Sequence, residues 1–299
     1  MDRDEFIITV YCLVCDQYRV IKNTSPVRRG GFAPALSDEE VITMEVCGEY
    51  FKLTTDKDLF AYFRAHYAHF FPKLTDRTLF VRQAANLWHV KGLIQQRLTQ
   101  VSGQSADPVQ IIDTLPLPVC GYTRSGRDRC FASVADYGHC AAKQLDYYGF
   151  KLGLRITRCG MIIHYPLLPA RPHDIRLLDE LVAGFAGWIP ADKGFIDAYR
   201  HALLTERHSV VVVTPPRKGM TPAHPSYLLT VCAWLRKGVE TVGSHLTERF
   251  AVARIRVHDL WHFQHRLIRK VLAHTVAVFV NLQLGRSPLD LDGLVTVSS

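Results

Sequence analysis

The chain has 299 residues, of which 48% are hydrophobic, and this is enough to bury a full-sized core. We expect two domains from this length. No stretch approaches the ~18 to 20 uninterrupted apolar residues that cross a bilayer. The first residues, MDRDEF, are charged where a secretory signal would be apolar. The sequence therefore argues against a membrane partner and predicts a cytoplasmic protein.

The formal net charge of +8 is concentrated in one part of the chain. Between residues 211 and 270 only three side chains are acidic. Ten are basic: Arg217, Lys218, Arg236, Lys237, Arg249, Arg254, Arg256, Arg266, Arg269 and Lys270. A surface of this sign attracts polyanions, and nucleic acid is the commonest of them. The alternative is a solvated surface without a partner, and charge alone leaves both open.

The first hundred residues are expected to be helical. Ser37 and Glu40 have the spacing of a capping box, in which each side chain accepts a hydrogen bond from the other residue's backbone amide. Apolar residues follow at helical spacing: Val41, Met44, Cys47 and Phe51. Two further helix starts, at Thr55 and Thr75, predict a compact all-helical unit.

The hydrophobic periodicity changes after the polar segment 103–108. Apolar runs rich in β-branched residues predict five strands, at 109–113, 150–157, 161–168, 188–192 and 209–214. Amphipathic patterns predict helices at 173–185, 196–204 and 228–246. This order predicts a ribonuclease-H-like α/β fold with a mixed five-stranded sheet. We therefore predict a helical domain at 1–103 and a ribonuclease-H-like catalytic domain, with C-terminal basic helices, at 104–299.

Pro190 interrupts the fourth of these apolar runs. Proline has no backbone N–H and cannot donate to a strand ladder. We therefore expect the fourth strand to be short or bulged at this residue.

Three acidic residues are placed where their side chains could meet. Asp113 and Asp192 each end an apolar run, where a charge can leave the sheet. Glu240 lies at the edge of the apolar stripe of the helix 228–246, one turn after Arg236. Hard divalent cations such as Mg²⁺ take carboxylate ligands, and two ions about 3.5 to 4 Å apart can promote phosphoryl transfer.

Each acid also has an ordinary structural interpretation. Asp113 and Asp192 could cap turns, which is the usual role of an aspartate at a strand end. Glu240 could pair with Arg236 on the helix surface, an interaction worth only a few tenths of a kcal/mol. The residues taken singly do not choose between these interpretations.

Taken together, four segments resemble the insertion-sequence transposases of the DDE type: IDTLPLPVC, DYYGFKL, ADKGF and RKGVETVGSHL. The resemblance covers about residues 109–284, and the helical N-terminal region also resembles that of one bacterial branch. It implies that Asp113, Asp192 and Glu240 are the catalytic residues and bind Mg²⁺ or Mn²⁺, as two ions. It further implies a DNA transposase that nicks element ends by hydrolysis and then joins the freed 3′-hydroxyl to target DNA.

Members of a related branch carry Tyr and Lys at fixed offsets around the helical acid, where this chain has Ala233 and Thr247. The basic residues predicted to bind DNA are Lys151, Lys193, Arg217, Lys218, Arg236, Lys237, Arg249, Arg254, Arg256 and Arg266. The implied partners are the terminal inverted repeats of the element and target DNA, with a homodimer on DNA because two ends are joined. No glycine-rich phosphate loop is present in the sequence, so no nucleotide cofactor is predicted.

Two alternative functions fit the same residues. A structure-specific nuclease or resolvase with this fold would hydrolyse DNA without joining it. A catalytically inactive relative would bind DNA with a steep salt dependence and would not cut it.

Overall fold

The computed structural model describes residues 1–24, 27, 30, 33–140 and 144–296, and the chain divides into two compact units. Unit 1 consists of Met1–Ser102, His245–Val252 and Trp261–Ser299, and unit 2 consists of Gly103–Ser244 and Ala253–Leu260. The first boundary coincides with the polar break expected near residue 103. The C-terminal helix, which we expected in the second domain, belongs almost entirely to unit 1.

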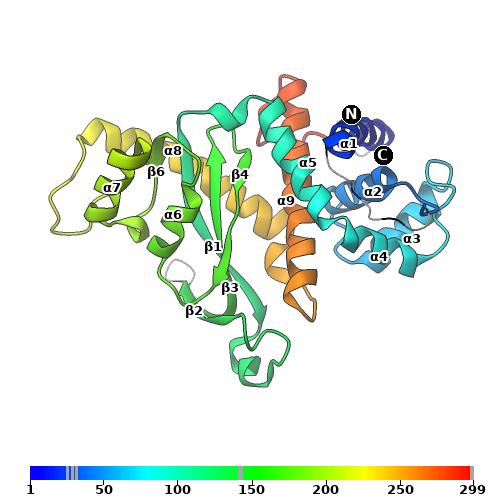
Figure 1. Ribbon diagram of the computed structural model, residues 1–299, viewed down its shortest axis with the longest axis horizontal. Coiled ribbons are helices and arrows are strands. Elements are labelled where there is room, and N and C mark those ends of the chain that lie inside the picture. The colour runs from blue at the N-terminus through cyan, green and yellow to red at the C-terminus, as the bar shows by residue number, and fades with distance from the viewer. Residues whose placement is uncertain (25–26, 28–29, 31–32, 141–143, 297–299) are drawn as a thin grey trace. The chain divides into compact units, whose positions relative to one another are not determined.

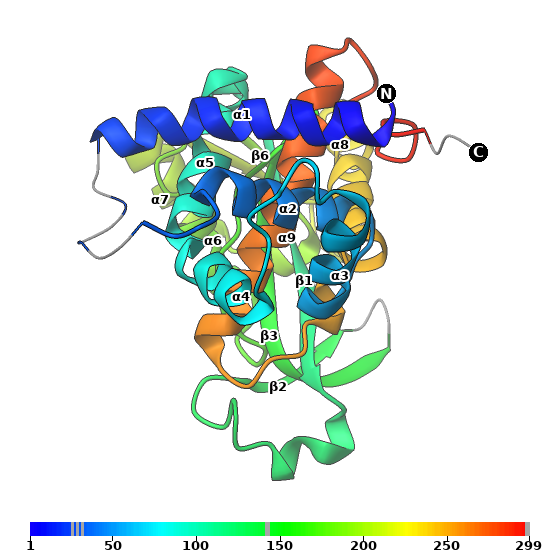
Figure 2. The ribbon, with the colours of Figure 1, turned by 90° about the vertical axis from the view of Figure 1, so that its right-hand side faces the viewer.

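Unit 1 is helical. Its α-helices are α1 (Arg3–Thr24), α2 (Asp38–Tyr50), α3 (Asp56–His66), α4 (Arg77–Asn86), α5 (Trp88–Val101) and α9 (Leu260–Gln283). Figure 2 shows α1 lying across α2 and α5, and residues of α1 contact both helices. None of the described helices is both long and apolar enough to span a membrane.

The predicted helix starts in unit 1 are largely confirmed. The Ser37 hydroxyl accepts a hydrogen bond from the Glu40 amide at 3.1 Å, and the Glu40 carboxylate accepts one from the Ser37 amide at 2.6 Å. Thr55 caps α3 as expected. The segment predicted as one helix from Thr75 is instead two helices, because the chain leaves the helical path at Leu87.

Buried charges from three helices neutralise one another inside unit 1. Arg269 of α9 contacts Glu49 at 2.6 Å and Glu45 at 3.3 Å, both on α2. Lys270 pairs with Glu49 at 2.7 Å, and Lys91 of α5 pairs with Glu45 at 2.6 Å. The interpretation of all ten basic residues as one exposed surface is therefore wrong for Arg269 and Lys270, which are 1% and 3% exposed.

Unit 2 is built on a sheet of five strands that pair antiparallel around β3 (Figure 1). The strands are β1 (Gln110–Cys120), β2 (Asp136–Cys140), β3 (Leu145–Thr157), β4 (Ile162–His164) and β5 (Leu167–Pro169). β1 continues well past Asp113, through two prolines, which an edge strand tolerates because that edge needs no donor. The run 161–168 is two short strands, and β2 was not predicted because its residues are mostly polar.

Two more strands, β6 (Gly187–Pro190) and β7 (Val210–Val213), pair parallel to each other. β6 also lies beside the start of β1, where Val109 and Trp188 form a parallel bridge and the Trp188 amide donates to the Pro108 carbonyl at 2.8 Å. Gly187 permits this approach, because a Cβ there would lie 2.3 Å from the Pro108 oxygen. β6 ends at Pro190, so the fourth predicted strand is short, as expected.

The helices of unit 2 are α6 (Leu178–Leu181), α7 (Ala198–His208) and α8 (Ser226–Ser244). The predicted helix at 173–185 is only a 3₁₀ turn, Asp174–Leu177, followed by the single turn of α6. Ile112, Ile189, Ala191 and Val212 belong to one buried core cluster. Two of these residues directly precede Asp113 and Asp192, so the core fixes the backbone from which both acids emerge.

Candidate active site

Asp113 and Asp192 lie at the same level of two neighbouring parallel segments. Asp113 follows Val109 by four residues and Asp192 follows Trp188 by four residues, and Val109 and Trp188 form the bridge between the segments. Parallel extended segments advance together, so equal offsets from a bridge bring two residues side by side. The backbone of Asp192 is extended, and the preceding residue donates to the Val213 carbonyl.

The electrostatics of Asp113 are those of a carboxyl group in an acidic, partly desolvated environment. The pKa of Asp113 is raised from 3.8 to about 6, mainly because the carboxyl group is buried, and the charges of Asp192 and Asp174 act in the same direction. The Thr114 amide, which donates to Asp113 at 2.8 Å, and Arg236 act in the opposite direction. Removal from water is therefore the main reason why the charged form of Asp113 is unfavourable here.

Arg236 on α8 is the cation nearest to Asp192. Its Nη1 lies 3.2 Å from the Asp192 Oδ1, and its side chain is mostly buried. α8 reaches this position because Gly243 allows it to pack closely on β1, where a Cβ would lie 3.1 Å from Leu115. The Nε of Arg236 is buried and has no hydrogen-bond partner among the described residues.

Glu240 follows Arg236 by one helical turn and is exposed on α8. The sequence also allowed a surface ion pair between Arg236 and Glu240. In the structure, Arg236 is positioned by its ion pair with Asp192. Among the residues that the structure describes, no three His, Cys, Asp or Glu side chains are grouped closely enough to hold a metal ion. The structure thus brings together Asp113, Asp192 and Arg236, and it does not bring Glu240 to them.

A fourth acidic residue, Asp174, lies at this site and was not predicted. One oxygen of its carboxylate lies 2.7 Å from the Lys151 Nζ, and the other lies 2.8 Å from the place of a Cβ on Gly194. Lys151 also donates to the Pro172 carbonyl at 2.7 Å. In the sequence, Asp174 resembles an ordinary residue at a helix start, and only the fold places it against the turn that carries Asp192.

The contact between Gly194 and Asp174 predicts a stability effect. Gly194→Ala is expected to destabilise the protein by about 1 kcal/mol or less, because the new methyl group displaces the Asp174 carboxylate, the end of a flexible side chain, from its ion pair with Lys151. In an Asp174→Ala background the cost should be smaller, since the colliding atoms are gone. Chemical denaturation of the four proteins of this double-mutant cycle measures both values.

Gly238→Ala is the matched control, because Gly238 lies on α8 and has no atom within 4 Å of the added methyl group. Alanine has the higher helix propensity, so this variant should be neutral or slightly stabilised. Equal costs for Gly194→Ala in both backgrounds would contradict the contact.

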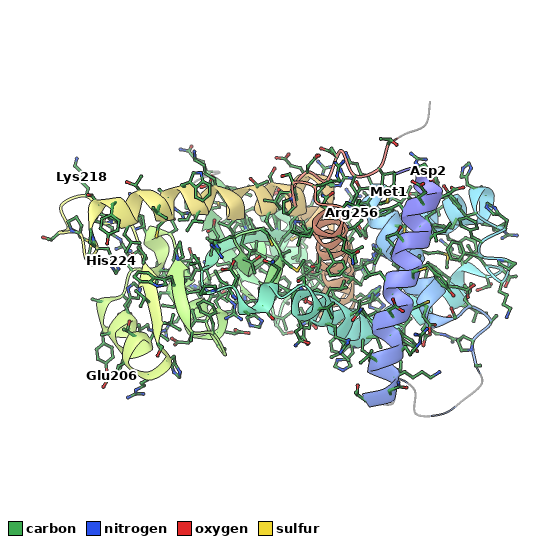
Figure 3. All side chains as sticks on the ribbon, turned by 90° about the horizontal axis from the view of Figure 1, so that it is seen from above. Met1, Asp2, Glu206, Lys218, His224 and Arg256 are labelled. Atoms are coloured by element: carbon green, nitrogen blue, oxygen red, sulfur yellow. The ribbon has the colours of Figure 1, made fainter. Side chains whose placement is uncertain are left out.

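The remaining predicted DNA-binding residues of unit 2 lie on its surface. Lys193 directly follows Asp192, and its carbonyl oxygen accepts a hydrogen bond from Arg217 at 3.3 Å. Figure 3 shows the Lys218 side chain pointing away from the ribbon in the segment before α8. Lys237 on α8 is exposed, as are two arginines near the end of unit 2: Arg254 and Arg256.

Two other predicted DNA-binding residues, Arg249 and Arg266, lie in unit 1 and have partners there. Arg249 pairs with Asp292, and its guanidinium lies 4.4 Å from the centre of the Tyr50 ring. Arg266 pairs with Asp56 at 2.6 Å. Within unit 1 both side chains are therefore held by intramolecular contacts.

Comparison with known protein families shows which family the chain resembles. A family model described as a transposase DDE domain matches residues 103–259, which is more than half of the chain and includes Asp113, Asp192 and Glu240. No curated protein and no solved structure matches the chain.

Proposed function

Because this chain belongs to the transposase DDE domain family, we propose that it nicks the ends of a DNA element by hydrolysis and joins the freed 3′-hydroxyl to target DNA. The observation that supports this most is the placement of Asp113 and Asp192 side by side next to Arg236. Acidic side chains in this arrangement suit the chemistry of a phosphodiester, whose charge grows during the reaction.

The proposal includes a ribonuclease-H-like fold for unit 2. Antiparallel strands around β3, a parallel pair β6–β7 beside the start of β1, and the long helix α8 packed on β1 support it. We assign the helical region 1–103 to the binding of DNA ends. A homodimer on DNA follows from the need to process two terminal inverted repeats together.

The donor set suits two Mg²⁺ or Mn²⁺ ions. Asp113 and Asp192 supply the hard oxygen ligands that these ions prefer, and a bound cation would favour the charged form of Asp113, which burial disfavours. Glu240 is the third ligand in this proposal, and its exposed side chain has to move toward the aspartates. Bound ions would activate the attacking oxygen and stabilise the leaving one.

The chain's own cations hold the DNA strand in this proposal. Arg236 lies beside Asp192, so it can bind a phosphate oxygen when the carboxylates turn to the ions. Lys151 forms an ion pair with Asp174 and holds this carboxylate in place beside the two aspartates. The exposed lysines and arginines of unit 2, including Lys193, Lys218 and Lys237, supply sequence-independent contacts to the backbone.

Asp192→Asn tests the assignment. With labelled element-end DNA and Mg²⁺, the parent should give specific nicks, and the variant should cut at least about a thousandfold more slowly. Asp197→Asn is the control, because Asp197 caps α7 through a hydrogen bond from the Arg200 amide and asparagine caps equally well. If Asp192→Asn cuts as fast as the parent, the proposed site is wrong.

An inactive DNA-binding relative is the second candidate. The position of Glu240, which is not grouped with the two aspartates, favours it. It predicts DNA binding that weakens steeply with salt and no cleavage with either Mg²⁺ or Mn²⁺. In the same assay, nicks without joined products would indicate a nuclease or resolvase.

A further inference from the structure

A separate pocket of about 320 Å³ lies in unit 2 near the far end of β1. Its lining includes Tyr122, Leu145, Tyr147, Arg254, Ile255 and Arg256. Cys120, which also lines the pocket, follows Asp113 by seven residues in the same strand. Pro118, where the lining begins, follows Asp113 by five residues, so at about 3.3 Å per residue the pocket lies roughly 17 to 23 Å along the strand from Asp113 and is distinct from the acidic site.

The inner surface of the pocket is apolar and aromatic. Tyr147 and Ile255 are buried, and Leu145 and Tyr122 are partly exposed beside them. The Tyr122 ring lies edge-on to Tyr137 at 5.4 Å between centroids, and 51% of Tyr122 is exposed. An aromatic side chain held by another ring and open on one side can stack on a planar ligand.

The rim of the pocket carries positive charge. Arg254 and Arg256 line it and are exposed, and Figure 3 labels Arg256. The acid that also lines it, Asp146, pairs with His139 at 2.8 Å. The neighbouring segment between β1 and β2, which Figure 1 shows extending beyond the strands, adds three exposed arginines: Arg124, Arg127 and Arg129.

We propose that this pocket binds one unpaired nucleotide of a DNA strand, with the base on Tyr122 and the phosphates at Arg254 and Arg256. Its volume is at the lower end of the range of small-ligand sites, about 300 to 1,000 Å³, and suits a single nucleotide. A base inside a duplex is covered by its neighbours, so only an unstacked base could enter. This inference rests on the proposed function, which makes DNA the substrate.

The distance from Asp113 to the pocket predicts where along the DNA the unpaired nucleotide lies. DNA rises about 3.4 Å per nucleotide along one strand, so roughly 17 to 23 Å corresponds to about five to seven nucleotides. An unpaired nucleotide about that far from the reacting phosphate would reach the pocket while the phosphate lies at Asp113. A distortion at this distance would distinguish the bound DNA from an undisturbed duplex.

The test measures binding of the full-length Asp113→Asn protein, without metal, to three fluorescent duplexes of one sequence. One duplex is fully paired, one carries a single bulged nucleotide, and one carries the same bulge without its base. The bulged duplex should bind about tenfold tighter than the other two. Tyr122→Ala should remove this preference, and Tyr122→Phe should keep it.

Two controls separate stacking from charge. Tyr199→Ala removes a tyrosine of α7 that is 74% exposed and lies outside the pocket, and it should leave the preference unchanged. Arg254→Ala should weaken binding of all three duplexes alike. It should also reduce the slope of log affinity against log salt concentration by about one, as expected for the loss of one phosphate contact.

The outcomes distinguish this inference from the proposed function. If the protein binds DNA but shows no preference for the bulge, or if Tyr122→Ala retains the preference, the pocket assignment is overturned and the transposase proposal stands. If no duplex is bound at all, both fail together. Tighter binding of the baseless bulge than of the paired duplex would show that flexibility of the strand is recognised instead of the base, and would also overturn the assignment.

Discussion

Replacing Asp113 by asparagine is expected to slow DNA cleavage by at least about a thousandfold and to stabilise the metal-free protein at neutral pH. The loss of activity follows from the removal of a proposed metal ligand. The gain in stability follows because the charged carboxylate is unfavourable where it lies, as the raised pKa of about 6 indicates. Asparagine keeps the shape of the side chain without its charge.

The pH dependence of the free energy of unfolding shows that the ionised form of Asp113 destabilises the folded protein. Between the ordinary pKa of 3.8 and about 6, the folded state of the parent holds the Asp113 proton more tightly than the unfolded state does. The contribution of this group to stability is therefore full below pH 3.8, falls as the pH rises toward 6, and is lost above 6. Asp113→Asn lacks this fall and should be about 1 to 3 kcal/mol more stable at pH 7.

Urea denaturation at pH 4, 5.5 and 7, with and without Mg²⁺, measures these effects. Mg²⁺ should stabilise the parent, more so above pH 6 where Asp113 is ionised, and should stabilise Asp113→Asn much less. Asp197→Asn serves again as the control for loss of a carboxylate. An Asp113→Asn protein that is less stable than the parent at pH 7, or equally stabilised by Mg²⁺, would contradict the electrostatic account.

Arg269→Met is expected to destabilise the protein by about 3 to 5 kcal/mol, the largest stability effect that we predict. The Arg269 guanidinium contacts Glu45, Glu49 and Asp56, and the two glutamates are almost fully buried. Burial lowers the pKa of Arg269, but the three carboxylates outweigh it and hold the pKa above its ordinary value. Removing this cation leaves buried negative charge with too few partners.

Arg266→Met is the matched control, because Arg266 also pairs with Asp56 but its side chain is 20% exposed. Its loss should cost about 1 kcal/mol or less, since water can solvate the remaining carboxylate. Denaturant unfolding measures both variants. If the slope of the unfolding free energy against denaturant concentration is unchanged, the shift of the midpoint gives the loss of stability. Equal costs for Arg269→Met and Arg266→Met would show that the buried network does not contribute as its contacts suggest.

Local patterns in the sequence predicted the parts of the fold that depend on near neighbours. The capping box at Ser37 needs only residues within one turn, and it forms as expected. Runs of apolar residues led to Asp113 and Asp192, although β1 continues past Asp113 to Cys120, and the bridge between Val109 and Trp188 brings the two acids together. The match to a transposase family covers the segments around these residues.

The parts that depend on distant contacts were not predicted. Asp174 looks like any residue at a helix start until the fold places it against Gly194 and Lys151. A charge count cannot reveal that Arg269 is buried, because its partner Glu49 lies 220 residues earlier in the chain. The helical pattern put Glu240 at the edge of the packed face, and in the structure it is exposed directly after buried Val239; its role as a third ligand stays a prediction.

The discontinuity of unit 1 has a consequence for synthesis. Glu45 and Glu49 leave the ribosome early, whereas Arg269, which neutralises them, is made only after the whole of unit 2. The first helices therefore lack part of their final packing while translation is under way. Until α9 emerges, Glu45 of α2 has Lys91 of α5 as a partner, but Arg269 and Lys270 are still missing. Termination before α9 would leave a product without a completed N-terminal region, so only chains translated through α9 can assemble it.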